Sequence, residues 1–173
     1  MVFGDIECST MGRFVNWLYT GCIPSHEEEE EAQHGSPEQA NMIDLINLCA
    51  LANRFFVSLL EEDVVRAAEY YLYPDDDTAI VPTCEIVTFA YDHLPDDHEF
   101  LKLLVNSFCH GWIKAKDGWG PEQFKELPSK FLFQVTAKFA EDAQTSEEKM
   151  EKLDRKARKY YPWYAKSINA GYN

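Results

Sequence analysis

Histidines and cysteines gather in one region of the chain, and together they could bind a metal ion. Cys84, His93, His98, Cys109 and His110 all lie between positions 84 and 110. Structural zinc sites use pairs of closely spaced ligands, but His93 and His98 straddle a proline turn at a helix end. Cys109 and His110 are adjacent on an expected helix and therefore point about 100° apart. We predict buried cysteines and surface histidines here, with no metal and no cofactor.

Residues that could perform catalysis lack the spacing that catalysis requires. The sequence contains no nucleophile elbow, phosphate-binding loop, dinucleotide fingerprint or zinc-protease motif. Its carboxylates occur in runs at 27–31 and 75–77, where mutual repulsion favours solvated loops over tuned active sites. The run at 27–31 belongs to an expected acidic loop over 24–35, and the alternative is a docking patch for a basic partner. We predict that the chain is not an enzyme.

The composition is that of an acidic globular protein. The chain has 173 residues, of which 46% are hydrophobic and 14% aromatic, and its formal net charge is −14. This charge argues against non-specific binding to nucleic acid or anionic membranes, which requires clustered Lys and Arg. Five widely spaced cysteines and the lack of a signal-peptide or membrane-span pattern predict a cytoplasmic or nuclear protein.

Helical spacing of apolar residues runs through the whole chain. The expected helices cover residues 9–19, 36–54, 58–73, 83–94, 96 or 97 to about 112, 128–142 and one that begins at 145, with a short turn around 124. Capping boxes are predicted at Ser36…Gln39 and Ser58…Glu61, and Gly21 is the expected stop of the first helix. No β alternation longer than four residues occurs, so the predicted fold class is mainly α, with little or no sheet.

The C-terminal part differs in charge from the rest. Residues 145–173 carry seven basic and four acidic residues, and an aromatic run follows at 160–164. We expect this helix to pack a thin apolar stripe on the body, with Phe139 and Met150 as partners. The alternative is a contact with nucleic acid or another anionic surface, with the aromatic residues stacking.

Two segments carry a family resemblance: FVNWLYTG at 14–21 and LINLCALANRF at 45–55. Together they resemble the second half of a BTB/POZ domain, and residues 82–135 resemble the helical tail of fungal single-BTB proteins. The strand and helix region that begins the family's domain has no counterpart before Phe14. The signature residues are Phe14, Trp17, Leu18, Tyr19, Thr20, Gly21, Leu45, Leu48, Leu51 and Ala52.

The resemblance implies three regions and a function. Residues 1–73 would be a partial BTB/POZ-like domain, 74–144 a helical extension, and 145–173 a charged helix with an aromatic tail. The implied function is a protein–protein interaction module without catalysis, with self-association and cullin-linked adaptor activity if the full module exists. The alternative is a stand-alone helical structural protein, or a truncated remnant without a partner of the family's kind.

Aromatic pairs beside the expected core could be interface anchors, because aromatic residues dominate interface hot spots. The pairs are Trp17 with Tyr19 and Phe55 with Phe56. We expect them to be core residues, and interface anchors are the alternative.

Overall fold

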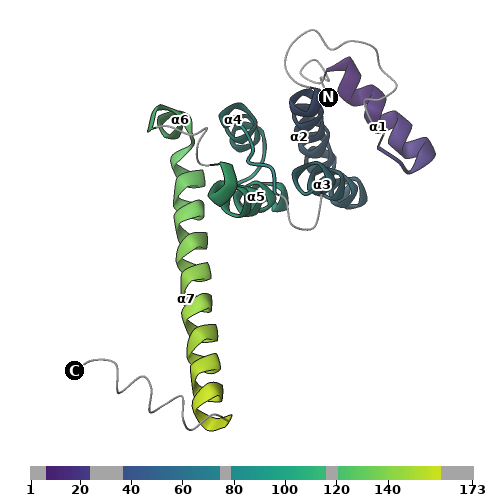
Figure 1. Ribbon diagram of the computed structural model, residues 1–173. Helices are drawn as coiled ribbons and strands as arrows, with labels where there is room; N and C mark the ends of the chain where they lie inside the picture. The colour runs from purple at the N-terminus through teal and green to yellow at the C-terminus, as the bar shows by residue number, and fades with distance from the viewer. Residues whose placement is uncertain (1–6, 24–36, 75–78, 116–120, 161–173) are drawn as a thin grey trace. The chain divides into compact units, whose positions relative to one another are not determined.

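Helices form nearly all of the structure. The computed structural model describes residues 7–23, 37–74, 79–115 and 121–160. Its helices are α1 (Cys8–Thr20), α2 (Pro37–Phe55), α3 (Ser58–Leu72), α4 (Cys84–His93), α5 (Glu99–Ala115), α6 (Pro121–Glu126) and α7 (Ser129–Tyr160) (Figure 1). No strand occurs in these residues, so the predicted mainly α class is confirmed. The chain divides into two compact units, Met1–Val135 and Thr136–Asn173.

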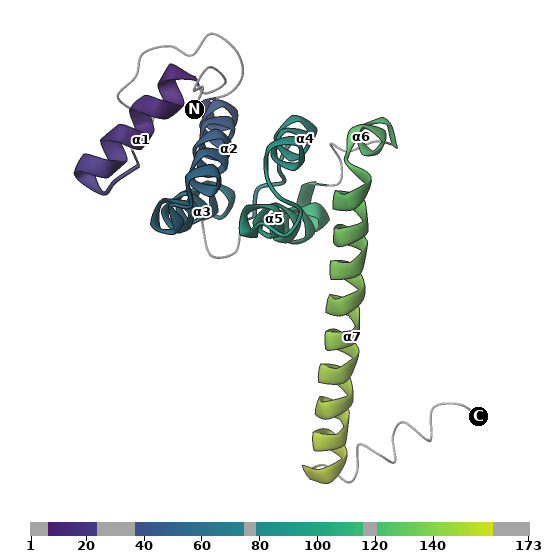
Figure 2. The ribbon, with the colours of Figure 1, turned by 180° about the vertical axis from the view of Figure 1, so that it is seen from behind.

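The core of the first unit is organised around α2. Ile46, Leu48, Cys49 and Ala52 have no exposed surface, because α2 is apolar on nearly every side and must be covered by its neighbours. α1 and α4 lie on opposite sides of α2, and α3 packs against it (Figures 1 and 2). The remaining core comes from the inward faces of α3, α4 and α5 and from the start of α7.

A narrow polar stripe interrupts the apolar surface of α2. Asp44, Asn47 and Arg54 line a hollow of about 390 Å³ beside α1 and α4. Asp44 forms an ion pair with Arg13 of α1 at 3.1 Å. The stripe therefore serves in part to attach α1.

The end of α1 and the start of α4 follow the sequence signals. Gly21 adopts a left-handed conformation (φ +67°), and its N–H donates to the Trp17 carbonyl at 2.7 Å. The Thr83 hydroxyl accepts the N–H of Ile86 at 3.3 Å and so caps α4. The predicted stop at Gly21 is confirmed.

The junction between α2 and α3 differs from the prediction. Val57 N–H donates to the Ala52 carbonyl at 2.9 Å and Phe56 N–H to the Asn53 carbonyl at 3.2 Å, which is the Schellman pattern. Phe56 takes the left-handed position with φ +57°. Ser58 is already inside α3, whose capping residue Val57 provides no side-chain hydrogen bond. The capping box predicted at Ser58 is therefore wrong, because the reversed chain begins α3 one residue earlier; the box at Ser36 lies outside the described residues.

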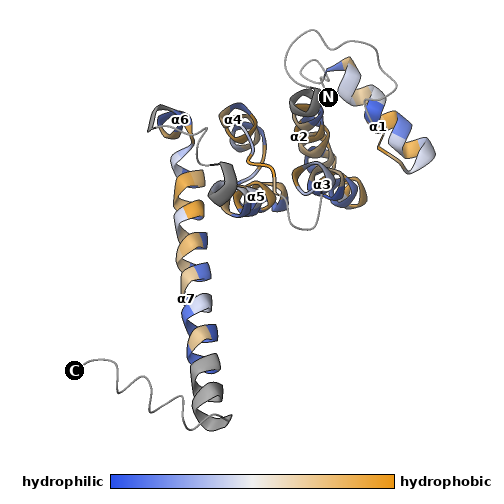
Figure 3. Cartoon of the chain, viewed as in Figure 1, coloured by the Kyte–Doolittle hydropathy of each residue, from blue (hydrophilic) through white to orange (hydrophobic). Residues whose placement is uncertain are grey.

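α7 is one continuous helix where the sequence suggested two. No Gly or Pro interrupts Ser129–Tyr160, and the Ser146 hydroxyl donates to the Asp142 carbonyl at 2.8 Å, which satisfies it inside the helix. The break predicted at 142–145 is therefore wrong. Hydrophobic residues on α7 lie mostly in its first half, and hydrophilic residues follow further along the coloured part of the helix (Figure 3).

Because α7 is one continuous helix, the predicted contact between Phe139 and Met150 does not form. Phe139 and Met150 lie eleven residues apart on this one helix, or about 16 Å along its axis, so they are not packing partners. Lys152 and Glu148, four residues apart on α7, form an ion pair at 3.9 Å. The aromatic run from 161 onward lies outside the described residues.

Candidate functional site: a buried histidine cluster and an exposed aromatic corner

The predicted metal candidates are dispersed. His93 is exposed, and its Nδ1 lies 2.8 Å from the Phe89 carbonyl; His110 is exposed, and its Nδ1 lies 3.3 Å from the Tyr73 hydroxyl. Cys109 is buried and Cys84 half-buried. Within the described ranges no three His, Cys, Asp or Glu side chains group as a metal site would require.

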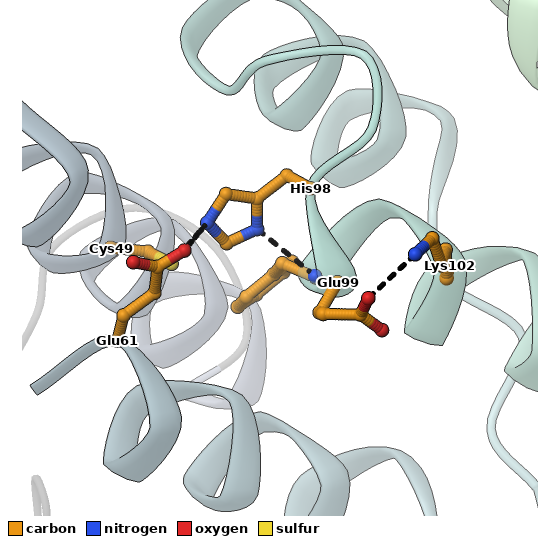
Figure 4. A network of polar contacts seen from close by, with 6 residues as sticks. Cys49, Glu61, His98, Glu99 and Lys102 are labelled. Atoms are coloured by element: carbon orange, nitrogen blue, oxygen red, sulfur yellow. Dashed lines mark hydrogen bonds and ion pairs between the residues drawn. The ribbon is translucent and has the colours of Figure 1, made fainter. Parts of the chain in front are cut away.

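His98 departs from the prediction of a surface histidine. It is 5% exposed and joins three helices. Its Nε2 lies 2.6 Å from Glu61 Oε1 of α3 and 3.6 Å from Cys49 Sγ of α2, and its Nδ1 accepts the N–H of Phe100 at 3.1 Å. Figure 4 shows the ring between Glu61 and the first turn of α5.

The hydrogen-bond partners assign the state of the imidazole. Because Nδ1 accepts the Phe100 N–H, Nδ1 carries no hydrogen, and Nε2 donates its own hydrogen to Glu61. His98 directly precedes α5, so its ring satisfies one of the free N–H groups at the start of that helix. The prediction of a surface residue fails because the side chain is a cap whose other nitrogen has a partner on α3.

This cluster contains the residue types of a nucleophilic site but not its geometry. Nucleophilic catalysis needs a base that accepts the thiol proton while a third group orients the other ring nitrogen. Here Cys49 and Glu61 both approach Nε2, and a backbone N–H occupies Nδ1. Burial, together with the nearby Glu61 charge, raises the pKa of the Cys49 thiol to about 12. The thiol therefore stays protonated, and the cluster serves to hold α2, α3 and α5 together.

Sequence reasoning could have found only part of this cluster. A polar residue just before an amphipathic helix, after the turn at Pro95, is the signal of a capping position. Nothing in the spacing indicates that Cys49 and Glu61 meet this cap, because these contacts depend on tertiary packing.

Glu61 also borders a hollow that opens to solvent. The hollow, of about 480 Å³, lies along α3 beside the first residue of α5 and is lined by Ser58, Glu61, Glu62, Val65, Arg66, Glu69 and Glu99. Arg66 pairs with Asp63 at 3.0 Å and Glu99 with Lys102 at 2.5 Å. Within the described part of the chain, the carboxylates of Glu62 and Glu69 have no hydrogen-bond or ion-pair partner.

The signature residues fall into two groups. Leu45, Leu48, Leu51 and Ala52 are all buried in α2. Phe14 and Trp17 of α1 are half-buried with stacked rings, and the Trp17 indole donates to Asp63 at 3.0 Å. Leu18, Tyr19, Thr20 and Gly21 are exposed at the end of α1.

Two aromatic residues expected in the core are fully in solvent. Tyr19 is 88% exposed and Phe56 is 93% exposed, whereas Trp17 and Phe55 are half-buried. The core prediction is wrong for Tyr19 and Phe56 because each lies at or just beyond a helix end, where the apolar face no longer points inward. Phe56 and Leu59, which is 68% exposed, are called the α2–α3 corner below.

Comparisons with known proteins leave the resemblance as a prediction. Searches against protein-family models, curated proteins and solved structures found no match. Among the described helices, none combines the length and apolarity needed to cross a membrane.

Proposed function

We propose that this protein is a BTB/POZ-like protein–protein interaction module without catalytic chemistry, acting in the cytoplasm or nucleus. The observation that carries the proposal is Phe56, a large aromatic side chain held almost entirely in solvent. Aromatic residues are enriched among the anchors of protein interfaces.

The backbone conformation of Phe56 is energetically unfavourable for a phenylalanine. A non-glycine residue with positive φ is strained, and a bulky one is a clear outlier. Glycine is the usual residue at this position of a Schellman motif. The ring is 93% exposed, so packing within the chain offsets little of this strain. Strain that folding does not explain supports a functional role.

The resemblance suggests which partners to test. It implies self-association and an adaptor or scaffold role in cullin-type ubiquitin ligases if a full module is present. The segments that carry it comprise the exposed end of α1 and the buried length of α2. The alternative remains a stand-alone helical structural protein or a truncated remnant, which would need neither partner.

Quantitative co-purification from source cells tests the proposal. Wild type is compared with Phe56→Gly, and with Phe133→Ala as a control, because Phe133 is also exposed, at 74%. We expect a defined protein set to be retained by wild type and by Phe133→Ala and lost from Phe56→Gly. A cullin in that set would favour the adaptor role. Identical recovery with all three chains would contradict an interaction role for Phe56.

A further inference from the structure

We infer that the α2–α3 corner and the neighbouring acidic hollow form one docking surface for a basic amphipathic segment of a protein partner. This inference rests on the proposed function and adds the chemistry of the partner. The corner supplies apolar contacts, and the hollow supplies negative charge.

The apolar part of the surface lies at the first turn of α3. Phe56 and Leu59 are 93% and 68% exposed, and Ser58, between them in sequence, lines the hollow. Val65, two turns further along α3, is half-buried and contributes an apolar side chain to the same hollow. Apolar side chains of a partner can therefore contact the corner and continue along α3.

The charged part consists of carboxylates without internal partners. Glu62 and Glu69 form no ion pair within the part of the chain described. Arg66, which also lines the hollow, pairs with Asp63 at 3.0 Å. Glu62 and Glu69 are seven positions apart on α3, which is about 10 Å along the helix axis. A helical partner with Lys or Arg two turns apart would match both carboxylates while its apolar face contacts the corner.

The same geometry argues against other ligands. Among the described residues, no three His, Cys, Asp or Glu side chains group as a metal site would require, so these carboxylates do not form a metal site. The rim of Glu61, Glu62, Glu69 and Glu99 repels nucleic acid and anionic lipid headgroups. A basic amphipathic protein segment can pair with the carboxylates and also cover the exposed aromatic ring.

Fluorescence anisotropy with a defined peptide tests the inference. The probe is a labelled 14-residue helical peptide with Leu on one face and Lys on the other, and its control carries Glu in place of every Lys. The full chain should bind the Lys peptide and not the Glu peptide. Phe56→Gly should weaken binding at least tenfold, and because glycine suits the left-handed position, this variant is expected to fold. Phe133→Ala should bind like wild type.

A second variant tests the charged part. Glu62→Gln combined with Glu69→Gln should weaken binding of the Lys peptide and reduce its sensitivity to salt. Equal affinity of wild type and Phe56→Gly, or no binding of the Lys peptide, would overturn the inference. Binding of the Glu peptide that depends on Phe56 would contradict the inference that the partner is basic, but it would still agree with the proposed function. Failure of the interaction role proposed for Phe56 would show separately, as identical co-purification with wild type and Phe56→Gly.

Discussion

At the scale of single residues, Phe56 combines an unfavourable backbone conformation with a side chain that is almost fully exposed. Its backbone has φ +57° and its ring is 93% exposed. A residue with a Cβ atom is destabilised by roughly 1–2 kcal/mol in the left-handed region. Glycine avoids this strain but loses more backbone entropy on folding than other residues do. We therefore predict that Phe56→Gly raises the free energy of unfolding by up to about 1 kcal/mol, measured by urea denaturation.

Phe56→Ala is the matched control for this prediction. Alanine removes the ring but keeps a Cβ in the left-handed region, so its free energy of unfolding should stay below that of Phe56→Gly. Equal values for the two variants would mean that backbone strain at position 56 is not the cause.

Cys49 gives the protein a defined response to alkaline pH. Its thiol has a folded-state pKa of about 12 against an ordinary value of 9.0, raised by burial and then by Glu61. The folded state keeps the proton where the unfolded state releases it, so stability is unaffected below pH 9 and falls as pH rises toward 12. For one thiol this amounts to about 1 kcal/mol between pH 9 and 10.

The pH dependence is measured by urea denaturation of wild type and Cys49→Ala at pH 7, 9 and 10. We expect the fall between pH 9 and 10 to be smaller in the variant, whatever its stability at pH 7. Tyr91, whose pKa is also raised to about 12, starts from 10.0 and adds to the fall mainly at higher pH. Parallel curves would contradict the role of Cys49.

At the scale of elements, the segment before α4 packs closely on α5. The Ser107 hydroxyl donates to the Ile80 carbonyl, and a Cβ added at Gly111 would lie 2.7 Å from the Ala79 carbonyl oxygen and 2.8 Å from a Val81 methyl. We predict that Gly111→Ala lowers the free energy of unfolding by about 1–3 kcal/mol, measured by urea denaturation.

Gly12→Ala in α1 provides the comparison. Nothing lies within 4 Å of a Cβ at position 12, so alanine there should stabilise the helix by up to about 1 kcal/mol. Similar changes in the free energy of unfolding at both positions would mean that the close packing of Ala79 and Val81 against α5 does not exclude a side chain at position 111.

The sequence predicts the elements that local chemistry determines. The glycine stop at Gly21 is visible in the sequence and present in the structure. The helix expected from 83 is also present, and its start is capped by the Thr83 hydroxyl. The all-round apolar character of α2 likewise predicts its burial.

What the sequence does not predict depends on neighbours. Ser58 is not a cap because the Schellman turn at Phe56 already reverses the chain. His98 is buried because Glu61 and Cys49 come from other helices. α7 continues because Thr145 and Ser146 signal a helix start without a residue that ends the preceding helix.

At the scale of the whole molecule, the chain combines a well-covered core with an apolar and acidic exterior. The net charge is −14, and several large side chains remain exposed on α1, α3 and the α2–α3 corner. A buried cluster of His98, Glu61 and Cys49 joins three helices of the core. These properties agree with a module whose function is to bind another protein.

Site-specific photo-crosslinking in source cells tests this claim most directly. A photoreactive phenylalanine analogue is placed at position 56 in one chain and at position 133 in another, since Phe133 is also exposed, at 74%. We predict a discrete protein adduct at position 56 and none of that mass at position 133. The absence of an adduct at 56, or the same adducts at both positions, would contradict an interaction surface centred on Phe56.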